Sequence, residues 1–131
     1  MVSNKFSIFN SRMHIKLNYK EEYLESTNNI KIRIRINNNI DRINVIYIHG
    51  LGERLEHYDF LYDEFESSNI ALSMLELRGH GLSDGKVKYI ENFEQYVDDL
   101  KKLIDTKFKD REFFLFGHST GALIESLFCQ I

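Results

Sequence analysis

A serine between two glycines stands out in the run FFLFGHSTGALIE, residues 113–125. Four apolar residues lead into Gly117, and Ser119 and Gly121 follow before a helix-like segment. A serine on a tight turn between a strand and a helix exposes its hydroxyl as a nucleophile for acyl transfer. Side chains at the two glycine positions would collide with neighbouring backbone in so sharp a turn. An ordinary glycine-assisted turn into a helix is the alternative for this motif.

A second glycine-containing loop follows another apolar run. Residues 43–48 (INVIYI) read as a buried strand, and HGLG (49–52) comes directly after it. Acyl transfer places negative charge on a carbonyl oxygen, which backbone N–H groups stabilise. Loops at the carboxyl ends of parallel strands can aim such groups at one point. We therefore predict that this loop supplies a donor beside Ser119; the alternative is a flexible strand end without a catalytic task.

Hydrophobic periodicity indicates the elements that must position these loops. Residues 30–36 alternate isoleucine with lysine or arginine, which predicts a half-buried strand with a cationic face. Asn92 is the predicted N-cap of the strongest helical stripe. Further strands are predicted at 43–48, 70–77 and 113–116, a turn-rich loop at 78–85, and helices at 54–66, at 93–108 and from Thr120 onward. This order predicts an α/β fold with a mostly parallel sheet and antiparallel leading strands.

Composition narrows the class of protein. The chain has 131 residues, 43% of them hydrophobic and 28% charged, which fits one globular domain. Its net charge of −3 argues against a nucleic-acid partner. Cys129, the single cysteine, rules out an internal disulfide and fits a reducing compartment. No signal-peptide-like or membrane-spanning run is present, so we expect a cytoplasmic protein with at most peripheral membrane contact.

Other kinds of site have little support in the sequence. The histidines and acids lack metal-ligand spacing such as H-E-x-x-H, and there is no glycine-rich phosphate loop, so we expect neither a metal nor a cofactor. The KIRIRI stripe (31–36) has the charge to meet phosphate or lipid headgroups. We favour a cationic solvent face on an early edge hairpin, because charged edges discourage pairing between chains.

Three motifs in order resemble a known superfamily. HGLGERLEHYDFL (49–61), LELRGHGLSDG (75–85) and FGHSTGAL (116–123) together resemble the α/β-hydrolases, and within them the monoglyceride lipase and lysophospholipase branch, grouped with serine aminopeptidase-like hydrolases. The resemblance implies that residues 21–131 are the N-terminal half of an α/β-hydrolase domain, truncated after the nucleophile elbow, and that 1–20 form an extension or first strand region. Glu76 stands where the family usually has aspartate, and Thr120 and Ala122 replace more frequent residues.

The resemblance also implies roles for individual residues. Ser119 would be the nucleophile, forming an acyl-enzyme with a lipid-like or small carboxylic ester. The backbone N–H groups of Leu51 and Thr120 would form the oxyanion hole. Gly117 and Gly121 would be the elbow glycines, and the residues implied to support the site are His49, Gly50, Glu53, Arg78 and His80.

The family's acid and histidine lie beyond the elbow, so this chain is expected to lack both. His118 is expected to point away from the Ser119 hydroxyl, and without a base a serine is a poor nucleophile. One hypothesis is therefore a serine esterase that needs a complementary C-terminal half. The alternative is a catalytically dead fragment or a non-enzymatic binding module of the same fold. In either case we expect the 113–116 strand to be an open edge, with little packing for Leu123, Ile124, Leu127 and Phe128.

Overall fold

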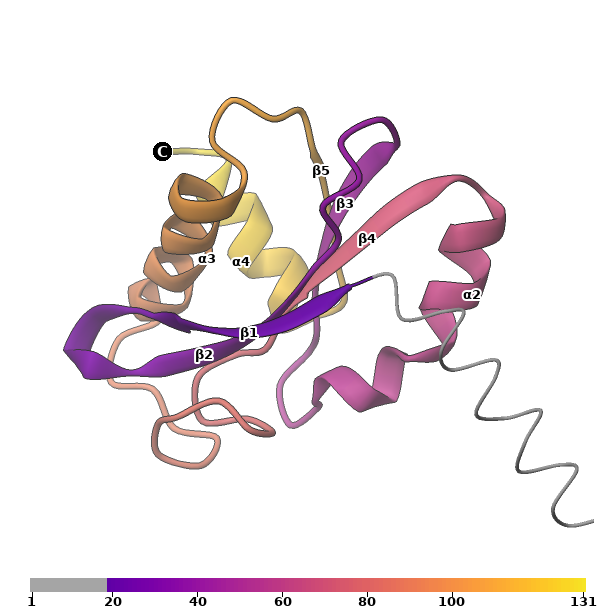
Figure 1. Ribbon diagram of the computed structural model, residues 1–131. Coiled ribbons are helices and arrows are strands. Elements are labelled where there is room, and N and C mark those ends of the chain that lie inside the picture. Colours follow the sequence, from indigo (N-terminus) through magenta and orange to yellow (C-terminus); the bar gives the residue numbers. More distant parts are fainter. Residues whose placement is uncertain (1–18) are drawn as a thin grey trace, which may run out of the picture.

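A five-stranded mixed sheet forms the centre of the computed structural model, which describes residues 19–131 (Figure 1). The sheet order is β1-β2-β4-β3-β5. β1 pairs with β2, and β2 with β4, in antiparallel fashion, whereas β3 pairs with β4 and β5 in parallel. The strands are β1 (Lys20–Glu25), β2 (Lys31–Ile36), β3 (Ile43–Ile48), β4 (Ile70–Leu75) and β5 (Phe114–Gly117). The predicted α/β fold with antiparallel leading strands is confirmed.

Helices cover both faces of this sheet. α3 and α4 lie on one face and α2 on the other (Figure 1). The helix predicted at 54–66 is instead a short 3₁₀ turn followed by an α-helix. The helical segments are η1 (Thr27–Asn29), η2 (Leu55–Tyr58), α2 (Phe60–Ser67), α3 (Glu94–Lys107) and α4 (Thr120–Phe128). No helix in residues 19–131 combines the length and the apolar character needed to cross a bilayer.

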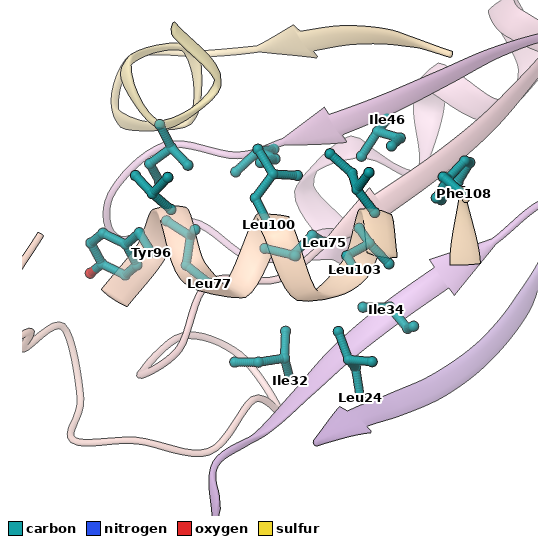
Figure 2. Close-up of a cluster of buried hydrophobic side chains, with 14 of the residues drawn as sticks. Leu24, Ile32, Ile34, Ile46, Leu75, Leu77, Tyr96, Leu100, Leu103 and Phe108 are labelled. Atoms are coloured by element: carbon teal, nitrogen blue, oxygen red, sulfur yellow. The ribbon is translucent and has the colours of Figure 1, made fainter. Parts of the chain in front are cut away.

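The larger hydrophobic core lies between the sheet and the helices α3 and α4 (Figure 2). α3 contributes the stripe that its periodicity predicts, including Leu100 and Leu103, both fully buried. The N-cap of α3 is Phe93, one residue later than predicted, but the Asn92 side chain accepts a hydrogen bond from the Glu94 N–H at 2.9 Å. The smaller core, under α2, consists of Val45, Tyr47, Leu55, Tyr62, Leu72 and Met74.

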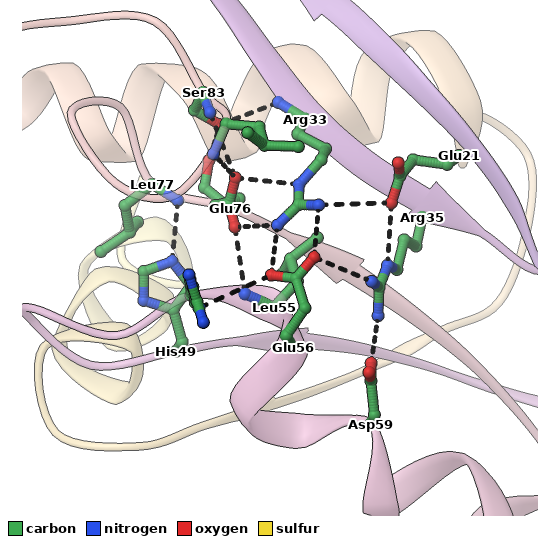
Figure 3. Close-up of polar contacts among 12 residues, drawn as sticks. Glu21, Arg33, Arg35, His49, Leu55, Glu56, Asp59, Glu76, Leu77 and Ser83 are labelled. Atoms are coloured by element: carbon green, nitrogen blue, oxygen red, sulfur yellow. Dashed lines mark hydrogen bonds and ion pairs between the residues drawn. The ribbon is translucent and has the colours of Figure 1, made fainter.

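The predicted cationic solvent face of 30–36 is wrong. β2 lies inside the sheet, between β1 and β4, and Arg33 and Arg35 are only 1% and 4% exposed. Arg33 binds Glu76 and Glu56, and Arg35 binds Asp59 and Glu21, forming a buried network (Figure 3). Buried guanidinium groups are tolerated when carboxylates neutralise them. The hydrogen bonds from Arg33 lower the pKa of Glu56 to about 2.

β5 forms one edge of the sheet, as predicted, and its side chains are poorly covered. Phe114 and Phe116 are 57% and 47% exposed, and Leu123 on α4 is 51% exposed. The rest of α4 packs better than expected. Ile124 is fully buried, and Leu127 and Phe128 lie against the larger core, so the expectation of poor packing is wrong for these three. The predicted N-terminal segment 1–20 falls largely outside the described residues.

Candidate active site

Ser119 lies on a sharp turn between β5 and α4, with an exposed side chain. Its backbone has φ 54° and ψ −115°, a conformation that costs a residue other than glycine about 1–3 kcal/mol. The turn is held by a hydrogen bond from the Gly121 N–H to the His118 oxygen (3.0 Å). The Leu123 N–H donates to the Ser119 oxygen (3.1 Å) and begins the helix. A strained backbone at an exposed serine favours the hypothesis that Ser119 is a nucleophile over the hypothesis of an ordinary glycine-assisted turn.

The two flanking glycines are required by close approach of α4 to the sheet. A Cβ at Gly121 would lie 2.0 Å from the Ile48 oxygen, and one at Gly117 would lie 2.3 Å from Oε1 of Glu125. Neither distance is compatible with a side chain. α4 can therefore start directly above the ends of β3 and β5 only because both positions lack Cβ atoms.

The two predicted oxyanion donors lie on loops that leave neighbouring strands at the same level. Ile48 at the end of β3 is the register partner of Gly117 at the end of β5. The His118 N–H donates to the Ile48 oxygen at 3.2 Å and ties the loops together. Within residues 19–131, the N–H groups of Leu51 and Thr120 have no hydrogen-bond acceptor. Free N–H groups beside an exposed serine can bind a developing oxyanion.

His49 and His80 hold the backbone around the first of these loops. His49 donates from Nδ1 to the Gly50 oxygen (2.7 Å) and accepts the Leu77 N–H at Nε2 (3.0 Å). Burial lowers the pKa of His49 to about 4, so the ring is neutral and can accept that hydrogen bond. His80 accepts the Gly52 N–H at Nε2 (2.9 Å) and lies near the Arg78 oxygen through Nδ1 (3.0 Å).

Glu53 contacts both loops, through Gly50 on one and His118 on the other. One carboxylate oxygen accepts the Gly50 N–H (2.8 Å) and lies 3.3 Å from Nδ1 of His118, while the other accepts the Tyr58 hydroxyl (2.6 Å). Partial burial alone would raise the pKa of Glu53, but these hydrogen bonds outweigh it and the pKa is lowered. Nδ1 of His118 is thus directed to Glu53.

Beneath the loops, Glu76 and Arg78 connect distant segments. The fully buried Glu76 carboxylate accepts hydrogen bonds from Arg33 and from the backbone N–H groups of Leu55, Leu82 and Ser83 (Figure 3). Both carboxylate oxygens of this glutamate accept hydrogen bonds. Arg78 makes a bidentate pair with the buried Asp99 of α3, at 2.8 and 2.7 Å.

Glu125 on α4 is a buried carboxyl directly behind the elbow that the sequence patterns did not single out. It is 5% exposed, and Oε2 has no hydrogen-bond partner within residues 19–131. Its Oε1 occupies the space that a side chain at Gly117 would need. Burial raises the pKa of Glu125 to about 8, so the carboxyl is largely neutral at neutral pH.

Comparison with known proteins identifies the family of this site. The family described as serine aminopeptidase, S33, a group of hydrolases, matches residues 40–130, which include Ser119 and both loops. The chain belongs to this family. Its curated relatives include a monoglyceride lipase homolog of monkeypox virus, 35% identical over 86 residues (63% of this chain, 31% of the relative). They also include the phospholipase YtpA of Bacillus subtilis (32% identical; 61% and 31%) and the monoglyceride lipase of Mus musculus (32%; 60% and 27%).

Solved structures give the same fold. A carboxylesterase structure from the thaumarchaeon Nitrososphaera gargenis superposes with a TM-score of 0.72 at 23% identity, covering 82% of this chain and 40% of that chain. A bacterial membrane phospholipase A superposes with a TM-score of 0.69 at 16% identity, covering 93% and 39%. This chain therefore spans less than a third of the curated relatives and about two fifths of these neighbours.

Within residues 19–131, no histidine is hydrogen-bonded to the Ser119 hydroxyl. His49 and His80 are both engaged with backbone groups, His118 is directed to Glu53, and His57 is exposed on η2. His14 lies outside the described residues. In the same range, no three histidine, cysteine, aspartate or glutamate side chains gather to hold a metal. In the described part of the chain, the exposed Ser119 thus lies beside free backbone N–H groups, without a histidine bonded to its hydroxyl.

Proposed function

We propose that this chain is the N-terminal part of a serine esterase of the monoglyceride lipase and lysophospholipase type. The observation that carries the proposal is the backbone of Ser119, held at positive φ on an exposed turn between a buried strand and a helix. The monoglyceride lipase and phospholipase relatives support a lipid-like ester as the substrate. The reducing compartment suggested by the lone, exposed Cys129 supports a cytoplasmic location.

In the proposed reaction, the Ser119 hydroxyl attacks the ester carbonyl. The N–H groups of Leu51 and Thr120 donate to the carbonyl oxygen as it becomes negatively charged. Collapse of the tetrahedral intermediate releases the alcohol and leaves an acyl-enzyme on Ser119, which water then hydrolyses. A histidine and an acid supplied by the complementary C-terminal half would accept the serine proton and deliver it to the alcohol.

A second candidate function is a non-enzymatic module that keeps the fold without the chemistry. The observation in its favour is that His49, His80 and His118 are each committed to other groups in the described part of the chain. Such a module would retain the loops and the buried network while leaving Ser119 unactivated.

Labelling with a fluorophosphonate tests the choice between them. This chain would be joined to the part of the monkeypox virus relative that follows its matched segment, which would supply the acid and the histidine of the proposed mechanism. We expect the probe to label the fusion and Ser119→Ala to abolish both labelling and ester hydrolysis. Ser126→Ala, which changes an exposed serine of α4, should retain both. Labelling that persists in Ser119→Ala would place the nucleophile elsewhere, and a folded fusion without labelling would favour the non-enzymatic module.

A further inference from the structure

The loop between β4 and α3 exposes three large apolar side chains within eight residues. Leu82, Val87 and Tyr89 are 60%, 77% and 51% exposed, and Lys86 and Lys88 stand among them. The segment 82–89 carries two lysines and one aspartate, so it is positively charged on a chain whose net charge is −3. Exposed apolar groups interleaved with lysines are typical of surfaces that meet anionic lipid.

Backbone hydrogen bonds hold this loop in a fixed shape. The Gly79 N–H donates to the Asp84 oxygen (2.8 Å), the Lys88 N–H to the Gly79 oxygen (3.0 Å) and the Tyr89 N–H to the Lys86 oxygen (3.0 Å). Lys88 has φ 51°, a strained value for a residue with a side chain. The apolar side chains are therefore kept in water by an ordered backbone, which makes them available to a partner.

The positive charges of Lys86 and Lys88 are also free to bind a partner. The Asp84 carboxylate accepts the Lys31 N–H at 3.0 Å, so it is directed toward β2. The Lys86 ammonium lies over the Tyr89 ring at 4.8 Å. Within residues 19–131, neither Lys86 nor Lys88 has a carboxylate within ion-pair distance.

The loop lies beside the entrance to the candidate active site. The Lys88 Cε is 3.8 Å from the position that a Cβ of Gly52 would occupy, and Gly52 follows the oxyanion donor Leu51. Leu51 is itself 57% exposed. In Figure 1 the β4–α3 connection extends along the same lower edge of the molecule as the loop that joins β3 to η2. Lys88 therefore lies against the loop that carries Leu51.

We propose that the 82–89 loop, with Leu51, docks this protein on an anionic lipid surface. Leu82, Val87 and Leu51 enter the boundary between headgroups and acyl chains, and Lys86 and Lys88 bind the headgroup phosphates. Tyr89 suits the same boundary, since its ring is apolar and its hydroxyl is polar. The docking depends on no catalytic step, so it holds whether or not Ser119 is activated.

Vesicle flotation of the 131-residue chain tests the docking, because aggregated protein stays at the bottom of the gradient. The vesicles are phosphatidylcholine alone, or phosphatidylcholine with about one third phosphatidylglycerol. We expect preferential binding to the anionic vesicles, weakened by salt. Lys86→Gln with Lys88→Gln should reduce that affinity about 25-fold, since each lysine near an anionic surface contributes about fivefold. Leu82→Ser with Val87→Ser should reduce binding at least fivefold on the same vesicles.

The matched control carries Ile40→Ser, Lys101→Gln and Lys102→Gln, which alter an exposed apolar residue and two exposed lysines outside this loop. It should bind as the unmodified chain does. Absence of binding to anionic vesicles would overturn the proposal, as would equal losses in the control and loop variants. Free phosphate, added with the ionic strength held constant, should not displace the chain from the vesicles. Displacement would show a site for phosphate rather than for a lipid surface, and would also overturn the proposal.

Discussion

Replacing Glu125 with glutamine should make the stability of the chain less sensitive to pH. The carboxyl is 5% exposed, Oε2 is unpartnered, and burial raises the pKa from 4.5 to about 8. A carboxyl whose pKa is raised by folding holds its proton more tightly in the folded state. The contribution of this carboxyl to stability is therefore fully present below the unfolded pKa, and it is lost as the pH rises from about 4.5 to about 8.

The size of this loss follows from the two pKa values. Each unit of pKa corresponds to about 1.4 kcal/mol, so the interval from 4.5 to about 8 corresponds to about 5 kcal/mol at alkaline pH. That is comparable with the whole free energy of unfolding of a small domain, about 5–15 kcal/mol. Glutamine has nearly the same shape and cannot ionise. Glu125→Gln should therefore match the unmodified chain near pH 4 and exceed it by several kcal/mol near pH 9.

Urea unfolding followed by circular dichroism at both pH values measures the effect. Glu112→Gln, at an exposed position, is the matched control and should keep the pH dependence of the unmodified chain. The carbon NMR signal of the Glu125 carboxyl should titrate near pH 8. Parallel stability curves for the unmodified chain and Glu125→Gln, with a titration midpoint near 4.5, would refute the reasoning.

Three further predictions concern the site, the buried network and the chain as a whole. In the fusion enzyme, Leu51→Pro removes a backbone N–H and should lower kcat about 10²-fold or more, whereas Leu51→Ala should lower it only modestly. If both variants fold and lose the same activity, Leu51 is not part of the oxyanion hole. Arg33→Met should lower the free energy of unfolding by about 3–5 kcal/mol, because the buried Glu76 loses its partner; an unchanged urea midpoint would contradict this. Light scattering of the chain alone should give a mass above the 15.6 kDa of one chain, because the exposed β5 edge favours association. The chain alone should not hydrolyse a p-nitrophenyl ester above background. Co-expression with a complementary C-terminal half should give an unassociated, active protein. For the chain alone, a monomer with Ser119-dependent turnover would contradict this prediction.

The elements next to the site were predictable because the positions of apolar residues in their sequences indicate which residues are buried. The near-continuous apolar runs of β3 and β4 correspond to strands buried on both faces, with every residue from Val45 to Ile48 and from Ala71 to Leu75 inside. The apolar residues at helical spacing in α3 correspond to one buried face of that helix. Antiparallel leading strands were predicted, but the bounds of β1 were not, because β1 is an edge strand in which Leu24 is the single buried residue.

The polar interior was not predictable because each buried charge depends on partners far away in the chain. Arg33 and Arg35 alternate with isoleucine as residues on a solvent face would. Their carboxylate partners, Glu21, Glu56 and Glu76, reach them only after folding. Glu125 stands in an apolar helix, and its burial depends on space left at Gly117. Periodicity shows which faces are hidden, but not which charges are neutralised there.

The buried arginines of β2 also bear on how the chain folds. The hydrogen bonds of Arg33 go to Glu76, directly after β4, and to Glu56 of η2. Those of Arg35 go to Glu21 of β1 and to Asp59, directly before α2. A partly folded state that held the β1–β2 hairpin against the sheet without η2 would bury positive charge lacking part of its compensation, at a cost of several kcal/mol. Such intermediates are disfavoured. The hairpin, the central strands and the segment after β3 should therefore gain protection from hydrogen exchange together, as one cooperative unit.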